Sequence, residues 1–241
     1  MARGPVTELR ILSAGAMREI VSELSEAYER RAGVKLSREY TRSPLVRDRI
    51  HAGEIFDVVV TTQSRISELA AENKVIPGSA AVLARSGIGV AVKEKQPKPD
   101  IGSVRAFVAT LRAAQSIACA DPAFGTASGL YLVELFDRLG LTAELKPKIR
   151  LVGTEGGKPV VVCAAVADGR CDLGLQQIAE IVPVPGVDVV GPLPEEIQHV
   201  TEFSVAVASS SRSPNLARDF VNFLTAEAAK AVITKHGMDP A

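Results

Sequence analysis

The chain has 241 residues, of which 46% are hydrophobic and 23% are charged, a composition typical of a globular protein. Its 28 basic and 28 acidic residues cancel, which argues against a broad electrostatic surface for nucleic acid or anionic membrane. No run of about 18 apolar residues could span a bilayer, so no direct membrane insertion is expected.

Short β-rich runs alternate with helical periodicity, which predicts βαβ units and mostly parallel sheets. In the first half, strands are expected at residues 9–13, 35–40 and 56–61, with a helix after each of the first two. Gly33 is expected to end the first of these helices. This alternation places the first half in the α/β class.

The same alternation restarts near residue 87. Further strands are expected at residues 87–92, 116–120, 150–153, 173–175, 187–190 and 200–208. Helices are expected at about 128–139 and before 168, and again after Ser213 and Pro214, a pair typical of a helix start.

Four strand-to-helix junctions carry small residues, at 13–16, 42–44, 125–129 and 156–159. In an open parallel sheet, ligands bind beyond the carboxyl ends of the strands, where helix N-termini point. Backbone N–H groups and hydroxyls at such junctions can bind an anion without any net positive charge. Two junctions in each half therefore predict a ligand cleft between the halves.

The cysteines and the first residues bear on the compartment. Cys119, Cys163 and Cys171 are odd in number and lack metal-ligand spacing, so no disulfide scaffold and no bound metal are expected. No Walker motif, Rossmann fingerprint, nucleophile elbow or zinc signature appears, and no cofactor is expected. Residues 1–10 contain no apolar signal segment, which predicts a cytoplasmic protein, or a periplasmic one if a signal was removed.

Several motifs together resemble a known family. In chain order they read LRILSAGAM, SPLVRDRIHAGEIFDVVV, PGSAAVLARSGIGVAV, ADPAFGTASGLY, CDLGLQQIAEI and EFSVAV followed by FVNFL. Over roughly residues 8–237 the sequence resembles the periplasmic molybdate-binding proteins of the type II solute-binding superfamily, whose relatives include aconitate isomerases. The resemblance implies two α/β lobes with a ligand cleft between them, lobe one at 1–86 plus 200–241 and lobe two at 87–199.

The resemblance also implies a set of ligand-binding residues. Ala16 stands where a ligand serine is common, Ser43 keeps the second serine, and Ser128 lies beside the N–H donor of the third loop. Pro159 falls close to a position whose N–H binds ligand, and Gln177 replaces a tyrosine. The predicted ligand-binding residues are Ser13, Gly15, Ala16, Arg42, Ser43, Thr126, Ser128, Lys158, Pro159 and Gln177.

Two cations distinguish this chain from a site made of neutral donors. Arg42 presents a planar fork suited to a carboxylate, and Lys158 adds a second positive charge. They favour a small organic polycarboxylate over a molybdate-like oxyanion. Simpler interpretations remain open, because Arg42 and Lys158 could be solvated, Ser43 could be only a helix N-cap, and residues 156–157 could only permit a turn.

Two functions remain open, since fold analogy does not decide between them. The first is a solute-binding protein for a small anion, with an ABC transporter permease as partner if the chain is exported. The alternative is an enzyme that isomerises cis- and trans-aconitate, for which Lys158, Glu155, His199 and Cys119 are candidate acid–base groups. No spacing singles out one of them, so the catalytic residues stay unknown. Asp57 is expected to be structural.

Overall fold

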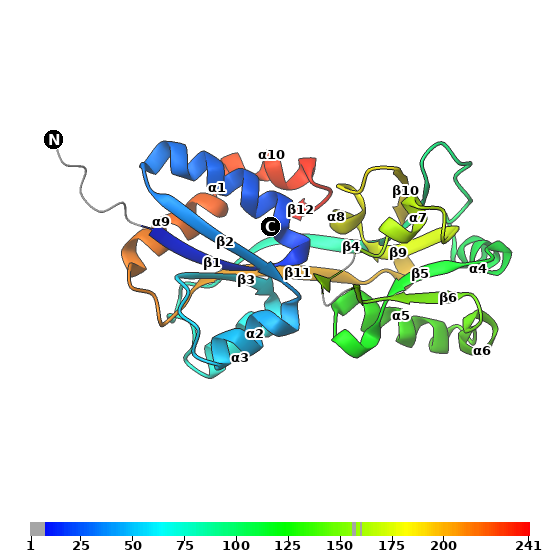
Figure 1. Ribbon diagram of the computed structural model, residues 1–241, viewed down its shortest axis with the longest axis horizontal. Helices are drawn as coiled ribbons and strands as arrows, with labels where there is room; N and C mark the ends of the chain where they lie inside the picture. The colour runs from blue at the N-terminus through cyan, green and yellow to red at the C-terminus, as the bar shows by residue number, and fades with distance from the viewer. Residues whose placement is uncertain (1–7, 156–157, 160) are drawn as a thin grey trace. The chain divides into compact units, whose positions relative to one another are not determined.

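The computed structural model describes residues 8–155, 158–159 and 161–241, and Figure 1 shows its helices and strands. The chain divides into two compact units. Unit 1 comprises the residues up to Arg85 together with Thr201–Ala241, and unit 2 comprises Ser86–Val200. Strand β4 (Ala81–Lys93) contributes its first residues to unit 1 and the remainder to unit 2.

Unit 1 alternates strands and helices in its N-terminal part. These elements are β1 (Glu8–Ala14), η1 (Gly15–Met17), α1 (Arg18–Ala32), β2 (Lys35–Thr41), α2 (Ser43–His51), β3 (Val58–Thr62) and α3 (Gln63–Ala71). The C-terminal part adds β11 (Val200–Val207), α9 (Pro214–Leu224), α10 (Glu227–Lys235) and β12 (Asp239–Pro240).

The sheet of unit 1 has the strand order β2-β1-β3-β11, with β4 next to β11. β1 runs parallel to β2 and β3, and its register places Ala14 opposite Thr41 and Ser13 opposite Val60. The carboxyl ends of β1, β2 and β3 therefore lie side by side at one edge of the sheet. Helices α1 and α10 cover one face of this sheet, and α2 and α3 cover the other (Figure 1).

Burial explains why these segments fold where they do. Leu12 and Val59 pack against Val46 of α2 and Ile66 of α3 in one buried cluster. Gly33 adopts a left-handed conformation with φ of 67° directly after α1, so its predicted role as the helix stop is confirmed.

The third strand begins two residues later than the sequence predicts, at Val58, and Asp57 lies just before it. The Asp57 carboxylate accepts hydrogen bonds from the Arg10 N–H at 2.9 Å, the Ser211 hydroxyl at 2.6 Å and the Arg212 N–H at 3.1 Å. These three bonds tie β1 to the loop after β11. The structural role predicted for Asp57 is confirmed.

Unit 2 contains shorter elements. After β4 come α4 (Val104–Ala113), β5 (Ile117–Ala120), η2 (Pro122–Phe124), α5 (Ala127–Arg138), α6 (Thr142–Leu145), β6 (Ile149–Val152), β7 (Thr154–Glu155) and β8 (Lys158–Pro159). The unit ends with α7 (Ala164–Ala167), β9 (Leu173–Gln177), α8 (Ile178–Ile181), β10 (Val187–Pro192) and η3 (Glu195–Ile197).

Strands of both directions make up the sheet of unit 2. β5 runs parallel to β6 and β9, whereas β4 is antiparallel to both β9 and β10. In unit 1, β11 is likewise antiparallel to β3. The expectation of mostly parallel sheets is therefore wrong for β4, β10 and β11.

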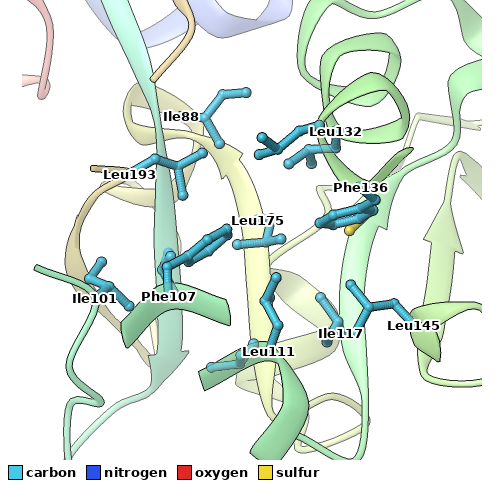
Figure 2. Packing of buried hydrophobic residues seen from close by; sticks show 14 of the residues in the cluster. Ile88, Ile101, Phe107, Leu111, Ile117, Leu132, Phe136, Leu145, Leu175 and Leu193 are labelled. Carbon is cyan, nitrogen blue, oxygen red and sulfur yellow. The ribbon is translucent and has the colours of Figure 1, made fainter. Parts of the chain in front are cut away.

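The main core of unit 2 lies between its sheet and helices α4 and α5. Ile88, Ile117 and Leu175 project from the strands toward Phe107 of α4 and Phe136 of α5 (Figure 2). On the opposite face, α7 packs over β5 through a smaller cluster, and α7 also contacts β9. The two clusters fix the carboxyl ends of β5, β6 and β9 at one edge of the sheet.

Candidate functional site

The first group of predicted ligand residues lies at the carboxyl edge of the unit 1 sheet. Ser13 is buried in β1 and its hydroxyl donates to the Ala14 carbonyl at 3.1 Å. Gly15 and Ala16 follow in η1, and a Cβ on Gly15 would lie 3.7 Å from the carbonyl oxygen of Thr41. The start of η1 thus lies next to the end of β2.

Arg42 and Ser43 come from the adjoining strand end. The Val46 N–H donates to the Arg42 carbonyl at 3.1 Å, so Arg42 is the N-cap of α2 and Ser43 is already its first residue. The interpretation of Ser43 as the N-cap is therefore wrong by one position. The Arg42 side chain is half-buried and its Nη1 atom is enclosed, so it is not a freely solvated loop arginine.

The backbone N–H groups at the starts of η1 and α2 can bind an anion. The first N–H groups of a helix have no intrahelical acceptor, and the helix dipole favours negative charge there. α2 has nine residues, with a guanidinium at its N-cap position and the Ser43 hydroxyl in its first turn. Unit 1 thus brings all five of its predicted residues to one edge.

Unit 2 presents a similar arrangement at the start of α5. Thr126 is the N-cap residue, and its Oγ1 atom is buried with no hydrogen-bond partner among the described residues. Ser128 is buried in the first turn. A Cβ on Gly129 would lie 2.9 Å from the Ala120 carbonyl oxygen, so glycine is what lets this turn approach the end of β5.

The fourth predicted junction differs from its expected form. Lys158 and Pro159 form β8, which pairs with β7 so that Thr154 lies opposite Pro159. The following helix, α7, begins only at Ala164, so Lys158 and Pro159 do not start a helix. The glycines at 156–157, predicted to permit a turn, lie outside the described residues.

Gln177 ends β9 and is buried, as is its neighbour Gln176. The Gln176 amide N–H donates to the Glu180 carboxyl of α8, and the Gln176 Oε1 atom has no hydrogen-bond partner in the part of the chain that the structure describes. Burial raises the pKa of the Glu180 carboxyl to about 7, against the hydrogen bond of Gln176, which lowers it. Sequence reasoning missed Glu180, because the only signal is a lone carboxylate in the short apolar helix after β9.

The predicted acid–base groups differ in their burial and in their contacts. Burial raises the pKa of the Cys119 thiol far above its ordinary value, so the thiolate is not available near neutral pH. His199 stacks on Tyr131 with ring centroids 4.6 Å apart, and burial lowers the pKa of its imidazole. Glu155 and Lys158 lie opposite each other in the β7–β8 pair.

Within the described ranges, no group of three or more His, Cys, Asp or Glu side chains is placed to hold a metal ion. None of the described helices is both long and apolar enough to cross a membrane. All three cysteines are free and buried, and Cys163, with an exposed fraction of 0%, packs as a small hydrophobic residue.

Residues 9–239 match the model of a family described as bacterial extracellular solute-binding protein. The chain belongs to this family. An aconitate isomerase of Pseudomonas sp is 36% identical over 248 residues, covering 100% of this chain and 90% of that protein. The predicted resemblance to solute-binding proteins is confirmed.

Solved structures of this family's fold lead to the same architecture. The periplasmic molybdate-binding protein of Azotobacter vinelandii superposes with a TM-score of 0.77 at 19% identity, covering 95% of this chain and 98% of that one. The substrate binding protein of an ABC transporter from Agrobacterium tumefaciens superposes with a TM-score of 0.71 at 15% identity, covering 96% and 79%. The predicted fold class, an α/β fold of the two-lobed periplasmic binding protein type, is confirmed.

Proposed function

We propose that this solute-binding protein holds a small organic polycarboxylate at the strand ends described above. The observation that carries the proposal is the Thr126 hydroxyl, which is buried at the N-terminus of a 12-residue helix without a partner among the described residues. A buried polar group normally has a hydrogen-bond partner, so this hydroxyl is explained if a ligand supplies one. The adjacent helix N–H groups would bind the negative charge of that ligand.

Arg42 directs the choice of anion toward carboxylates. Its guanidinium is half-buried at the N-cap of α2, and arginine binds a carboxylate with two parallel hydrogen bonds. A tetrahedral oxyanion held by neutral donors needs no such fork. The aconitate isomerase relative, whose name specifies a tricarboxylate, supports this choice over the molybdate named for the structural relative.

Calorimetric titration with cis-aconitate, trans-aconitate, citrate, molybdate and sulfate tests the proposal. Arg42→Ala should weaken carboxylate binding about ten- to a hundredfold, the loss expected for a charge-assisted hydrogen bond. Arg30→Ala removes an exposed arginine elsewhere in unit 1 and should leave the affinity unchanged. Tight molybdate binding with no measurable carboxylate binding would contradict the proposal.

The cleft predicted between the lobes stays a prediction. It requires that one ligand contact residues of both units, so Thr126→Val in unit 2 should weaken the same carboxylate that Arg42→Ala in unit 1 weakens. Thr126→Ser keeps the hydroxyl and should restore binding. If each variant affects a different anion, the two groups are separate sites.

A second candidate function is isomerisation of aconitate, favoured by the relative that is 36% identical over this whole chain. In that reaction a base removes a proton from the methylene carbon, the double bond shifts, and an acid returns a proton to the former vinyl carbon. Proton NMR of cis-aconitate in deuterated water would show trans-aconitate carrying deuterium. Saturable binding without conversion above the uncatalysed rate would leave a binding protein.

Export and delivery to an ABC transporter permease form the remaining part of the proposal. The family description, which names extracellular proteins, supports it, as does the ABC transporter protein among the structural relatives. Fractionation of cells that express the complete reading frame would test the location. Recovery in the cytoplasmic fraction alone would contradict an export role.

A further inference from the structure

The hydroxyl of Thr61 in unit 1 makes no hydrogen bond within the part of the fold that the structure describes. Thr61 of β3 is fully buried, with an exposed fraction of 0%, and its Oγ1 atom has no hydrogen-bond partner within the described ranges. Its polar neighbours are bonded: Ser204, opposite Thr61 in the register, donates to the Gln63 side chain, and Thr62 is bonded to Ser64 at 3.2 Å. Thr61 is therefore distinct from the hydroxyls around it.

The position of Thr61 along β3 places this hydroxyl at the carboxyl edge of the sheet. Side chains two residues apart in a strand share a face, so Thr61 lies on the face of Val59. Val59 packs with Val46 and Ile50 of α2, so this face is the one that α2 covers. Thr61 is one step beyond Val59 toward the end of the strand.

The N-terminus of α2 lies at that same edge. α2 begins two residues after β2 ends, and β2, β1 and β3 are parallel neighbours. Ser13 pairs with Val60, so the next residues along each strand, Ala14 and Thr61, are side by side. Thr61 thus lies next to the strand end from which Gly15 starts η1, on the α2 side.

Burial alone does not account for a threonine here. β3 reads Val58, Val59, Val60, Thr61, Thr62, and all five residues are buried. A valine at position 61 would have the same branched shape and no polar atom to satisfy. A hydroxyl enclosed without a partner destabilises the free protein, and a ligand that accepts its hydrogen bond removes that penalty.

We infer that Thr61 is an anion-binding residue, whose hydroxyl donates a hydrogen bond to an oxygen of the anion held at the start of α2. The inference rests on the proposed anion binding at this edge and adds a donor from a third strand. It applies to a carboxylate or an oxyanion, since either presents acceptor oxygens to a hydroxyl.

Three variants of the full chain test the role of Thr61. Thr61→Val removes the hydroxyl and keeps the shape, while Thr61→Ser keeps the hydroxyl. Ser25→Ala is the matched control, because Ser25 in the middle of α1 is also fully buried, with an Oγ atom that lacks a partner among the described residues. Each variant is titrated with cis-aconitate, trans-aconitate, citrate, molybdate and sulfate, and its melting temperature without ligand is measured.

Thr61→Val should weaken the bound anion about tenfold or more while the ligand-free melting temperature stays equal or rises. Thr61→Ser should bind within about threefold of the wild type, and Ser25→Ala should bind like the wild type. Unchanged affinity in Thr61→Val for every anion that the wild type binds would overturn the inference. An equal loss in Ser25→Ala would also overturn it, because the effect would then be a general one of packing.

The panel separates this inference from the proposed ligand class. If the wild type binds molybdate or sulfate and no carboxylate, the polycarboxylate proposal fails, and the Thr61 variants are read with the oxyanion that binds. If the wild type binds none of the five anions, both fail.

Discussion

Replacing Glu180 by glutamine should make the stability of the protein less dependent on pH. Burial raises the pKa of this carboxyl from its ordinary value of 4.5 to about 7, so the folded state keeps a proton that the unfolded state releases. Stability is therefore lost as the pH rises through this window, and the loss persists above pH 7. The Glu180→Gln variant has no such proton to lose.

The size of the effect follows from the same values. A raise from 4.5 to about 7 corresponds to at most about 3 kcal/mol of free energy of unfolding. Glu180 is partly exposed as a residue, and water that reaches the carboxylate reduces this figure, so we expect about 1–3 kcal/mol. Glutamine keeps the shape of glutamate and can still hydrogen-bond to Gln176, which limits changes that do not depend on pH.

Urea denaturation at about pH 4.5, 6 and 8 measures the effect as a difference between variant and wild type. The difference is needed because ion pairs lower the pKa of other carboxyls, such as Glu23 with Lys235 and Glu39 with Arg49, and these oppose the trend. The variant should gain relative to the wild type as the pH rises across this range. Glu196→Gln, at an exposed carboxylate of the same unit, should show no such gain.

A constant difference between the Glu180→Gln variant and the wild type across this pH range would refute the reasoning. It would mean that Glu180 ionises in the folded protein as it does in the unfolded chain. The burial of the carboxyl beside Gln176 and Cys163 would then not be the environment of the folded protein in solution.

Three further predictions concern the packing that supports the site. Gly129→Ala would place a Cβ 2.9 Å from the Ala120 carbonyl oxygen, so urea denaturation should show a loss of about 1–3 kcal/mol and calorimetry a weaker anion affinity; wild-type values would contradict the close approach. Phe107→Ala empties a fully buried position and should lower the free energy of unfolding by about 3–5 kcal/mol, and a loss below about 1 kcal/mol would contradict the core assignment. Cys119 should resist iodoacetamide at about pH 8 until denaturant is added, as mass spectrometry of the native protein would show.

The order of elements could be predicted from the sequence because burial has a period. Strands such as β3 begin with a run of buried apolar residues. Gly33 marks the end of α1 by a left-handed conformation that glycine adopts without strain. The direction of β4 and β11 could not be predicted in this way. An apolar run of a buried strand carries no signal of whether its neighbours are parallel or antiparallel.

Helices α3 and α4 were not predicted from the local sequence pattern. α4 carries Phe107 and Leu111 four residues apart, which is helical spacing, but seven of its ten residues are apolar, so the apolar residues are not confined to one face. α3 begins directly after β3 at Gln63, with no loop to separate the two patterns. In both cases the packing within the unit defines the helix, and the local sequence pattern does not predict it.

Polar residues whose role depends on burial were beyond the reach of the sequence. Thr61 follows a run of valines and looks like one more β-branched residue of a buried strand. Its buried hydroxyl, which lacks a partner among the described residues, distinguishes it. Glu180 lies in a four-residue helix, and its environment is assembled from Gln176 on β9 and Cys163 before α7. Arg42 and Ser43 could be predicted from the sequence, because their side chains can donate hydrogen bonds to an anion and they follow the end of a predicted strand.

Binding and isomerisation make different demands on the same strand ends. A binding protein needs donors matched to the ground state of its ligand, and Arg42, Ser43 and Thr126 are of that kind. An isomerase also needs one group that gives and takes a proton near neutral pH, which the buried Cys119 does not supply. Burial raises the pKa of the Glu180 carboxyl to about 7, so the loss of conversion in Glu180→Gln with binding retained would separate an enzyme from a carrier.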